Sequence, residues 1–160
     1  MPLLISDANI IIDLSDGGIL PLLFQLDHEF ATSDILFQEE LVGFEHDLLA
    51  LGLSLFEVNS VYMSKAFELK ERYSGPSRND CMILALAMQE NCTLLTGDRA
   101  LRQAAETEEI AVMGTIWLVR EMIIYGIISK IDAQIAFDKM KVQGSRLPWD
   151  KVEEMLQALP

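Results

Sequence analysis

Short apolar runs alternate with longer segments of helical periodicity along most of the chain. Runs that suit short buried strands lie at residues 2–6, 29–32, 53–58, 93–96 and 110–113. Between them, apolar residues recur at the spacing of one helix face in the segments 9–14, 19–26, 34–44, 60–73, 80–89 and 98–108. Because successive parallel strands need crossover connections, this alternation predicts an α/β fold with a mainly parallel sheet flanked by helices.

The last part of the chain has no strand pattern. From residue 115 onward we expect helices, in about three pieces separated by breaks at Gly126, Gly144 and Pro148. The sequence contains no internal repeat, low-complexity segment or linker. We therefore predict one domain over residues 1–160, with a core of about 1–114 and a helical C-terminal extension of about 115–160.

Four acidic residues stand out by their positions in this pattern. Asp7 follows the first strand, and Asp98 follows the strand at 93–96. Asp80 opens the most apolar helix, and Glu40 lies in the helix after the second strand. Parallel strands end at one edge of a sheet, where ligands bind in open α/β folds. We therefore expect Asp7, Asp80 and Asp98 to converge at that edge, with Glu40 nearby.

Each of these acids also has a purely structural interpretation. Asp98 precedes a helix and can cap it, since Asp is among the best N-caps. Asp7 can form an Asx turn, and Ser77 with Asp80 resembles a capping box. Taken together, however, the acids favour a functional cluster. In chain order, an Asp follows a strand, a Glu and then an Asp lie in helices, and a last Asp follows another strand.

Carboxylates that converge on one edge repel each other unless cations neutralise them. Sites made only of carboxylate oxygens suit Mg²⁺ or Mn²⁺. Such ions serve phosphoryl chemistry because they activate water and stabilise an in-line displacement. The sequence therefore predicts a divalent-cation site at this edge.

The charge balance of the chain is strongly acidic. Its formal net charge is −13 and its pI is about 4.4. This balance argues against the broad basic surface that nucleic-acid-binding proteins usually present. It suits a solvated acidic surface or carboxylates that hold cations, and it makes a basic protein partner plausible.

Other classes of site find little support in the sequence. Cys81 and Cys92 form no C-x-x-C pair and read as buried, reduced thiols, and His28 and His46 match no zinc spacing. The N-terminus lacks the basic region of a secretion signal. The apolar segment 116–128 is interrupted by charges and is too short to cross a bilayer. We expect a soluble, cytoplasmic protein without a membrane partner.

The acidic motifs resemble those of the PIN-domain family. The resemblance rests on Ile5-Ser6-Asp7-Ala8-Asn9, Glu40-Leu41, Asn79-Asp80 before Ile83-Leu84-Ala85-Leu86-Ala87, and Leu95-Thr96-Gly97-Asp98-Arg99-Ala100-Leu101. They occur in the family's order between Leu3 and about Gly114, and the Thr-Gly-Asp-Arg-Ala-Leu segment is the most specific. The tail resembles a subfamily with a C-terminal helical extension. The family comprises metal-dependent ribonucleases and includes VapC-like toxins of bacterial and archaeal toxin–antitoxin pairs.

The resemblance implies a three-layer PIN-like fold and a metal-dependent nuclease, an endoribonuclease that cleaves RNA. It assigns Asp7, Glu40, Asp80 and Asp98 as catalytic acids that bind Mg²⁺ or Mn²⁺. Glu39 would replace Glu40 if the register of that motif is shifted by one. Asn9 and Thr96 match polar positions that line the same pocket, and Arg99 lies where a cation can meet a substrate phosphate. A cognate antitoxin protein is the implied partner.

Three alternatives can be weighed from the sequence. A haloacid-dehalogenase-type phosphatase needs an acid where Asn9 stands, and a response-regulator receiver needs an acidic pair and a lysine that are not evident. The stronger alternative is a PIN-fold binding module or scaffold with little or no nuclease activity. The acidic surface favours that alternative, whereas the presence of all four acids opposes it.

The extension offers more apolar helix than a core of this size needs. Its closely spaced apolar residues are Trp117, Ile123, Ile124, Ile127 and Ile128. We expect these side chains to cover an edge of the core and to contribute to a homodimer interface.

Overall fold

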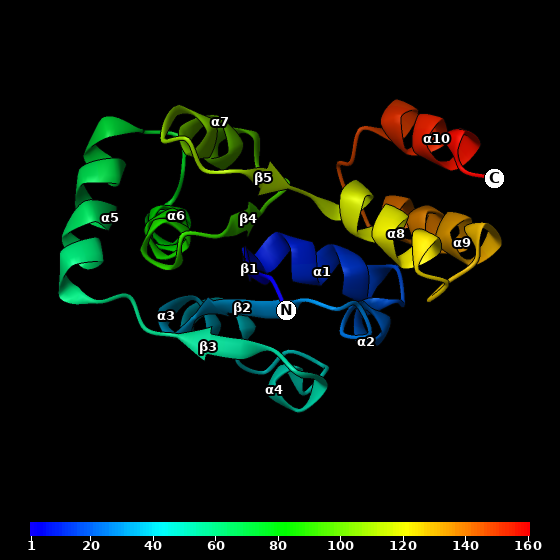
Figure 1. Ribbon diagram of the computed structural model, residues 1–160, viewed down its shortest axis with the longest axis horizontal. Coiled ribbons are helices and arrows are strands. Elements are labelled where there is room, and N and C mark those ends of the chain that lie inside the picture. Colours follow the sequence, from blue (N-terminus) through cyan, green and yellow to red (C-terminus); the bar gives the residue numbers. More distant parts are fainter.

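The computed structural model describes residues 1–160 and contains a five-stranded sheet flanked by helices (Figure 1). The strands are β1 (Leu3–Ser6), β2 (Glu29–Ser33), β3 (Ser54–Phe56), β4 (Thr93–Leu95) and β5 (Val112–Met113). Their order is β3-β2-β1-β4-β5, and every neighbouring pair is parallel. The predicted α/β fold is confirmed, and the sheet is parallel throughout.

Helices make all the connections between strands. Those of the core are α1 (Ala8–Asp16), α2 (Leu20–Leu23), α3 (Asp34–Leu36), the π-helical turn η1 (Phe37–Leu41), α4 (Leu48–Leu51), α5 (Ser60–Arg72), α6 (Arg78–Glu90) and α7 (Arg99–Thr107). The extension consists of α8 (Thr115–Ile124), α9 (Lys130–Val142) and α10 (Trp149–Ala158), as the predicted breaks indicated. None of the helices combines the length and apolar character that crossing a lipid bilayer requires.

The core is built around α6. This helix packs across β1, β2 and β4 on one side and against α5 on the other. Its residues from Cys81 to Ala87 are all buried, which explains why the sequence is apolar almost all round the helix.

The extension lies at the opposite end of the molecule from α5 (Figure 1) and packs against α1 through α8 and α9. Gly17, just after α1, favours this packing, because a Cβ there would lie 3.1 Å from the Ala136 carbonyl oxygen in the backbone of α9. Trp117, Ile123 and Ile127 are partly buried against the core and Ile128 is buried, whereas Ile124, which was expected to join them, is 47% exposed. The extension therefore covers part of the core with the other four apolar residues.

Two details between β2 and β3 differ from the sequence-based expectation. The helix predicted for residues 34–44 ends at Leu41, because its second half winds as a π-turn in which the Val42 N–H donates to the Phe37 carbonyl at 2.9 Å. The short helix α4 was not predicted, since four residues carry no recognisable helical period.

The order of the strands places one connection in a special position. The chain builds β1, β2 and β3 outward on one side and then returns past β1 to build β4 and β5 on the other. The strand order therefore reverses between β1 and β4. In open parallel sheets, the crevice beyond the carboxyl ends of the two strands at such a reversal is where ligands bind.

Candidate active site

Two of the predicted acids lie at this reversal. Asp7 directly follows β1, and Asp98 follows β4 by three positions. The backbone N–H of Asp7 donates to the Leu95 carbonyl at 3.1 Å, which joins the two strand ends. The expected meeting of Asp7 and Asp98 at the carboxyl edge of the sheet is thus a consequence of the topology.

Asp7 is buried and caps α1. Its Oδ1 atom accepts a hydrogen bond from the Ile10 N–H at 3.0 Å, and its Oδ2 atom accepts one from the Thr96 hydroxyl. Burial raises the pKa of Asp7 to about 7, against the opposing effect of these two hydrogen bonds. The negative charges of Asp80 and Asp13 raise the pKa further. No lysine or arginine pairs with this carboxyl group.

Asp80 is the third residue of α6 and forms the capping box that the sequence suggested. Its N–H donates to Ser77 Oγ at 3.0 Å, and its Oδ2 accepts from the Ser77 N–H at 3.2 Å. Partial burial raises the pKa of Asp80, and the charges of Asp98 and Glu40 raise it further. Asp80 therefore couples electrostatically with all three other acids, and its capping role does not exclude a functional one.

Asp98 and Glu40 complete the group. Asp98 caps α7 by accepting from the Leu101 N–H at 2.8 Å, and its own N–H donates to Thr96 Oγ1 at 3.0 Å. Glu40 lies in the π-turn and accepts from Asn79 Nδ2 at 2.8 Å, which ties it to the start of α6. Turns of this kind occur often at functional sites.

The neighbouring Glu39 points elsewhere. It lines a separate cavity of about 510 Å³, together with Met63, Phe67 and Met82 of α5 and α6. The register in which Glu40 belongs to the acidic group is therefore the one that this geometry favours.

The remaining predicted residues separate into two kinds. Thr96 is fully buried and bridges Asp7 and Asp98, whereas Asn9 and Arg99 are exposed on α1 and α7. Arg99 forms no ion pair. The structure therefore places the four acids and Thr96 near the strand reversal, although not close enough to share an ion, and leaves Asn9 and Arg99 exposed.

Sequence reasoning did not single out a layer of small polar residues beneath the acids. Ser6, Thr32 and Ser33 are buried at the carboxyl ends of β1 and β2. The Thr32 hydroxyl donates to the Ser6 carbonyl at 2.9 Å, and Ser33 caps α3. The available signal was a polar residue at the end of each apolar run, which became meaningful only once the strand register was known.

The donor set of this site suits a hard divalent cation. It contains only oxygen ligands, and Glu40, Asp80 and Asp98 each keep one carboxylate oxygen free of hydrogen bonds to the protein. As the side chains stand, however, no group of three or more acidic, histidine or cysteine residues is close enough to hold a metal ion. Each acid instead accepts a hydrogen bond from a neighbouring N–H or hydroxyl group, and these bonds keep the like charges apart.

Comparison with known proteins gives a family match over nearly the whole chain. The family model DUF3368, described as a PIN domain, matches residues 3–160. A search of curated proteins found no match.

Solved structures with the same fold come from several sources. A chain of VapBC2 from Rickettsia felis, bound to a DNA fragment from their promoter, shares 17% identity over 70% of this chain and 98% of its own, with a TM-score of 0.53. PAE2754 from Pyrobaculum aerophilum shares 16% identity over 75% and 89%, with a TM-score of 0.53. A chain of FitAB bound to an IR36 DNA fragment shares 18% over 70% and 94%, with a TM-score of 0.51. These TM-scores show a common fold.

Proposed function

Because this chain belongs to the PIN-domain family, we propose that it is a metal-dependent ribonuclease that hydrolyses the phosphodiester bonds of RNA. The observation that carries the proposal is the gathering of Asp7, Glu40, Asp80 and Asp98 around the reversal of strand order, coupled to one another through Asp80. No cation of the protein pairs with any of them. Such a group of carboxylates has a chemical use when an external cation joins it.

Glu40, Asp80 and Asp98 would hold Mg²⁺ or Mn²⁺ through their free carboxylate oxygens. The buried Asp7 would supply the fourth carboxylate. When bound, the ion supplies an activated water and stabilises charge on the phosphate. The chain contributes the positions of these acids. Thr96 fixes the Asp7 carboxylate, and the helix-capping bonds orient Asp80 and Asp98.

The protonation state of Asp7 also determines the pH at which the site can bind a cation. Because its pKa lies near 7, Asp7 keeps its proton in mildly acidic, metal-free solution and loses it as a cation binds. We therefore expect the affinity for the cation to rise with pH up to about 7, because binding has to displace this proton.

A toxin role with an antitoxin partner fits this fold. The VapBC2 and FitAB structures are complexes with DNA, and their likeness to this chain supports a toxin–antitoxin pair here as well. The net charge of −13 favours a basic antitoxin, since opposite charges speed the encounter of two proteins. With an RNA substrate and such a partner, the protein would act in the cytoplasm.

We also propose that the chain forms a single domain and a homodimer; because four of the five apolar residues expected at the interface are packed against the core, we assign the contact to α9 instead. On this helix Ile131, Ile135 and Val142 are 74%, 48% and 84% exposed and share one face. Residues 115–160 carry as many basic as acidic residues, so a second copy can approach here without the repulsion of the acidic core. In an antiparallel pair, Asp132 of one copy would face Lys139 of the other.

A binding module with little nuclease activity is the second candidate. It is favoured by one observation, namely that no three acids stand close enough together to hold an ion. Cation binding distinguishes the two candidates, because only the nuclease requires the acids to draw together around a metal.

The test is incubation of purified protein with a mixed pool of structured and unstructured RNAs, with Mg²⁺ or Mn²⁺ and with EDTA. We expect metal-dependent cleavage that is lost in Asp7→Asn and Asp98→Asn. Equal cleavage by wild type and Asp98→Asn would indicate a contaminant. No cleavage of any RNA, together with no metal binding, would support the binding module.

A further inference from the structure

A second cavity opens beside the acidic group, along one face of α7. Its volume is about 380 Å³, and its α7 wall consists of Ala100, Gln103, Ala104 and Thr107, at the spacing of a single helix face. The opposite wall is the segment 72–76 that joins α5 to α6. We refer to this cavity as the α7 groove.

Both walls of the α7 groove are close in sequence to acids of the proposed site. Ala100 follows Asp98 by two positions, and Pro76 precedes Asp80 by four. The two walls touch at this end, since a Cβ on Gly75 would lie 2.8 Å from the Ala100 Cβ. None of the four acids lines the groove, so a strand of nucleic acid whose phosphate lies at the acids has to pass the contact between Gly75 and Ala100 to place its next base there.

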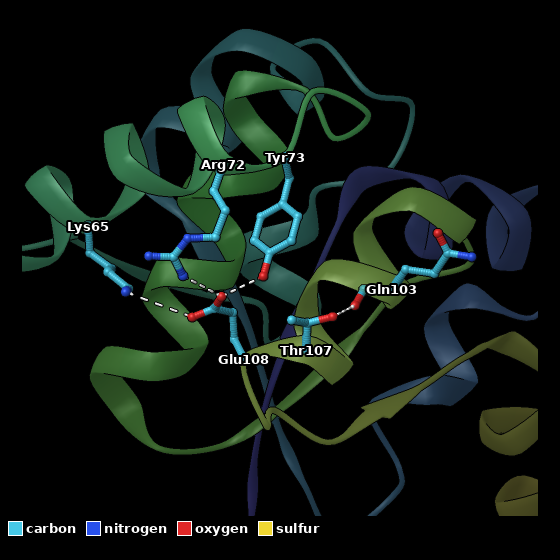
Figure 2. A network of polar contacts seen from close by, with 6 residues as sticks. All are labelled: Lys65, Arg72, Tyr73, Gln103, Thr107 and Glu108. Atoms are coloured by element: carbon cyan, nitrogen blue, oxygen red, sulfur yellow. Dashed lines mark hydrogen bonds and ion pairs between the residues drawn. The ribbon is translucent and has the colours of Figure 1, made fainter.

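Glu108 holds two residues of the groove wall, Arg72 and Tyr73, through the contacts drawn in Figure 2. Its Oε2 atom accepts from Tyr73 Oη at 2.6 Å and from Arg72 Nη1 at 2.7 Å, and Lys65 Nζ lies 3.8 Å from Oε1. The contacts hold the phenol ring and the guanidinium in place, and they neutralise much of the charge of Arg72. Proteins bind unstacked RNA bases on such aromatic rings and guanidinium planes.

Polar groups on the other wall are free to read the edge of a base. The Gln103 side-chain amide forms no hydrogen bond within the protein and offers both donors and an acceptor; in Figure 2 it extends away from Tyr73, so it would turn about its side-chain bonds to meet a base stacked on the phenol ring. The Thr107 hydroxyl donates to the Gln103 carbonyl at 2.9 Å and can still accept (Figure 2). Hydrogen bonds of this kind, added to stacking, are how proteins distinguish bases in single-stranded RNA.

The cations of the core lie on the same side. No lysine or arginine precedes Lys65, and up to residue 114 the others are Lys70, Arg72, Arg78, Arg99 and Arg102. All of them belong to α5, α6 and α7, the helices that border the acids and the groove. Arg78 and Arg99 are exposed and form no ion pair. Residues 60–114 carry these six cations against eight acids, whereas residues 1–59 carry eleven acids and no lysine or arginine, so a polyanion is repelled less from this side than from the rest of the core.

We propose that the α7 groove binds a nucleobase of single-stranded RNA next to the scissile phosphate, and that Gln103 sets the base preference. This inference rests on the ribonuclease function proposed above. It adds where the substrate strand runs and which residue discriminates between bases.

The experiment compares wild type with Gln103→Ala on single-stranded oligoribonucleotides of randomised sequence. Gln157→Ala, an exposed glutamine on α10, is the matched control. We expect a base preference beside the cut in wild type and in the control. Gln103→Ala should remove most of this base preference. It should also lower kcat/KM at the preferred sites by about tenfold, mainly through KM, because one hydrogen bond is lost. Thr107→Val, which removes the acceptor, should weaken the preference less.

A binding experiment without cleavage separates the groove assignment from the proposed ribonuclease activity. Oligoribonucleotides that carry the fluorescent base 2-aminopurine report stacking as a loss of fluorescence, and they need no cleavage. Cleavage by wild type with the same base preference in Gln103→Ala would overturn the groove assignment and leave the ribonuclease in place. If wild type cleaves nothing but Gln103→Ala alone loses binding, the groove assignment stands and the ribonuclease fails. If wild type neither cleaves nor quenches the probe, both proposals fail.

Discussion

Thr96 and Asp7 are joined by a buried hydrogen bond although they lie 89 positions apart in the chain. The Thr96 hydroxyl donates to Asp7 Oδ2, and its oxygen accepts the N–H of Asp98 at 3.0 Å. One small side chain thus connects the acids that follow β1 and β4. It stabilises the charged form of Asp7, which burial disfavours.

Substitution of Thr96 by valine tests this connection. Thr96→Val keeps the shape but leaves the Asp98 N–H and the Asp7 carboxylate without their partner. We expect unfolding to become easier by about 1–3 kcal/mol, and the pKa of Asp7 to rise further. Urea unfolding and the pH dependence of stability measure the two effects. Thr96→Ser retains the hydroxyl and should behave much like wild type, so equal losses in both variants would assign the effect to packing.

The raised pKa of Asp7 predicts how metal-free stability varies with pH. Since the folded-state pKa of about 7 exceeds the usual value of 3.8, the folded protein binds this proton more tightly than the unfolded chain does. Stability should therefore fall as the pH rises from about 4 to about 7, by up to about 4 kcal/mol from this group. Thermal unfolding in EDTA across this range measures the slope. Asp7→Asn should flatten it in part, because Asp13 and Asp80 are shifted in the same direction; an unchanged slope would exclude Asp7 as its source.

The Asp80→Asn variant tests whether repulsion between the carboxylates destabilises the metal-free protein. Its amide oxygen can still accept from Ser77, while the charge that couples with Asp98 and Glu40 disappears. In EDTA at neutral pH, we expect a melting temperature equal to or a few degrees above that of wild type. In millimolar Mn²⁺ the order should reverse, because only the intact site gains stability from the bound ion. A large loss of stability in EDTA would mean that capping is the main role of Asp80.

The exposed face of α9 predicts the oligomeric state. Light scattering should show a dimer for wild type and a monomer for Ile135→Lys, whose charge would lie in the apolar contact. Val61→Lys, at a 71% exposed position on α5, is the control and should stay dimeric. A wild-type monomer at high concentration would refute the interface.

The strand-end acids could be predicted from the sequence because a polar residue after a buried apolar run marks a strand end. For Asp7 and Asp98 this signal was local. The rule that parallel strands end at one edge of a sheet then predicted that the two residues lie near each other. The choice between Glu39 and Glu40 was different. Adjacent residues on a regular helix point about 100° apart, and here the π-turn decides which of them lies beside Asn79. No periodicity in the sequence reveals such a turn.

Residues that act through long-range contacts were also beyond the sequence. The buried layer of Ser6, Thr32 and Ser33 depends on the register of β1 against β2. The network around Glu108 depends on the approach of α5 to the end of α7, which no local pattern encodes. Gln103 gained significance only when the cavity beside it was known.

Calorimetric titration of Mn²⁺ into the purified protein at a pH above 7 tests the central claim most directly, since the acids must draw together around one ion. We predict binding by wild type, and affinity reduced at least about tenfold, or about 1.4 kcal/mol, in Asp98→Asn and Asp80→Asn. Asp150→Asn, which alters an exposed acid in the first turn of α10, should bind as wild type does. Absence of binding by wild type, or equal affinity in all four proteins, would contradict a metal site made by these carboxylates.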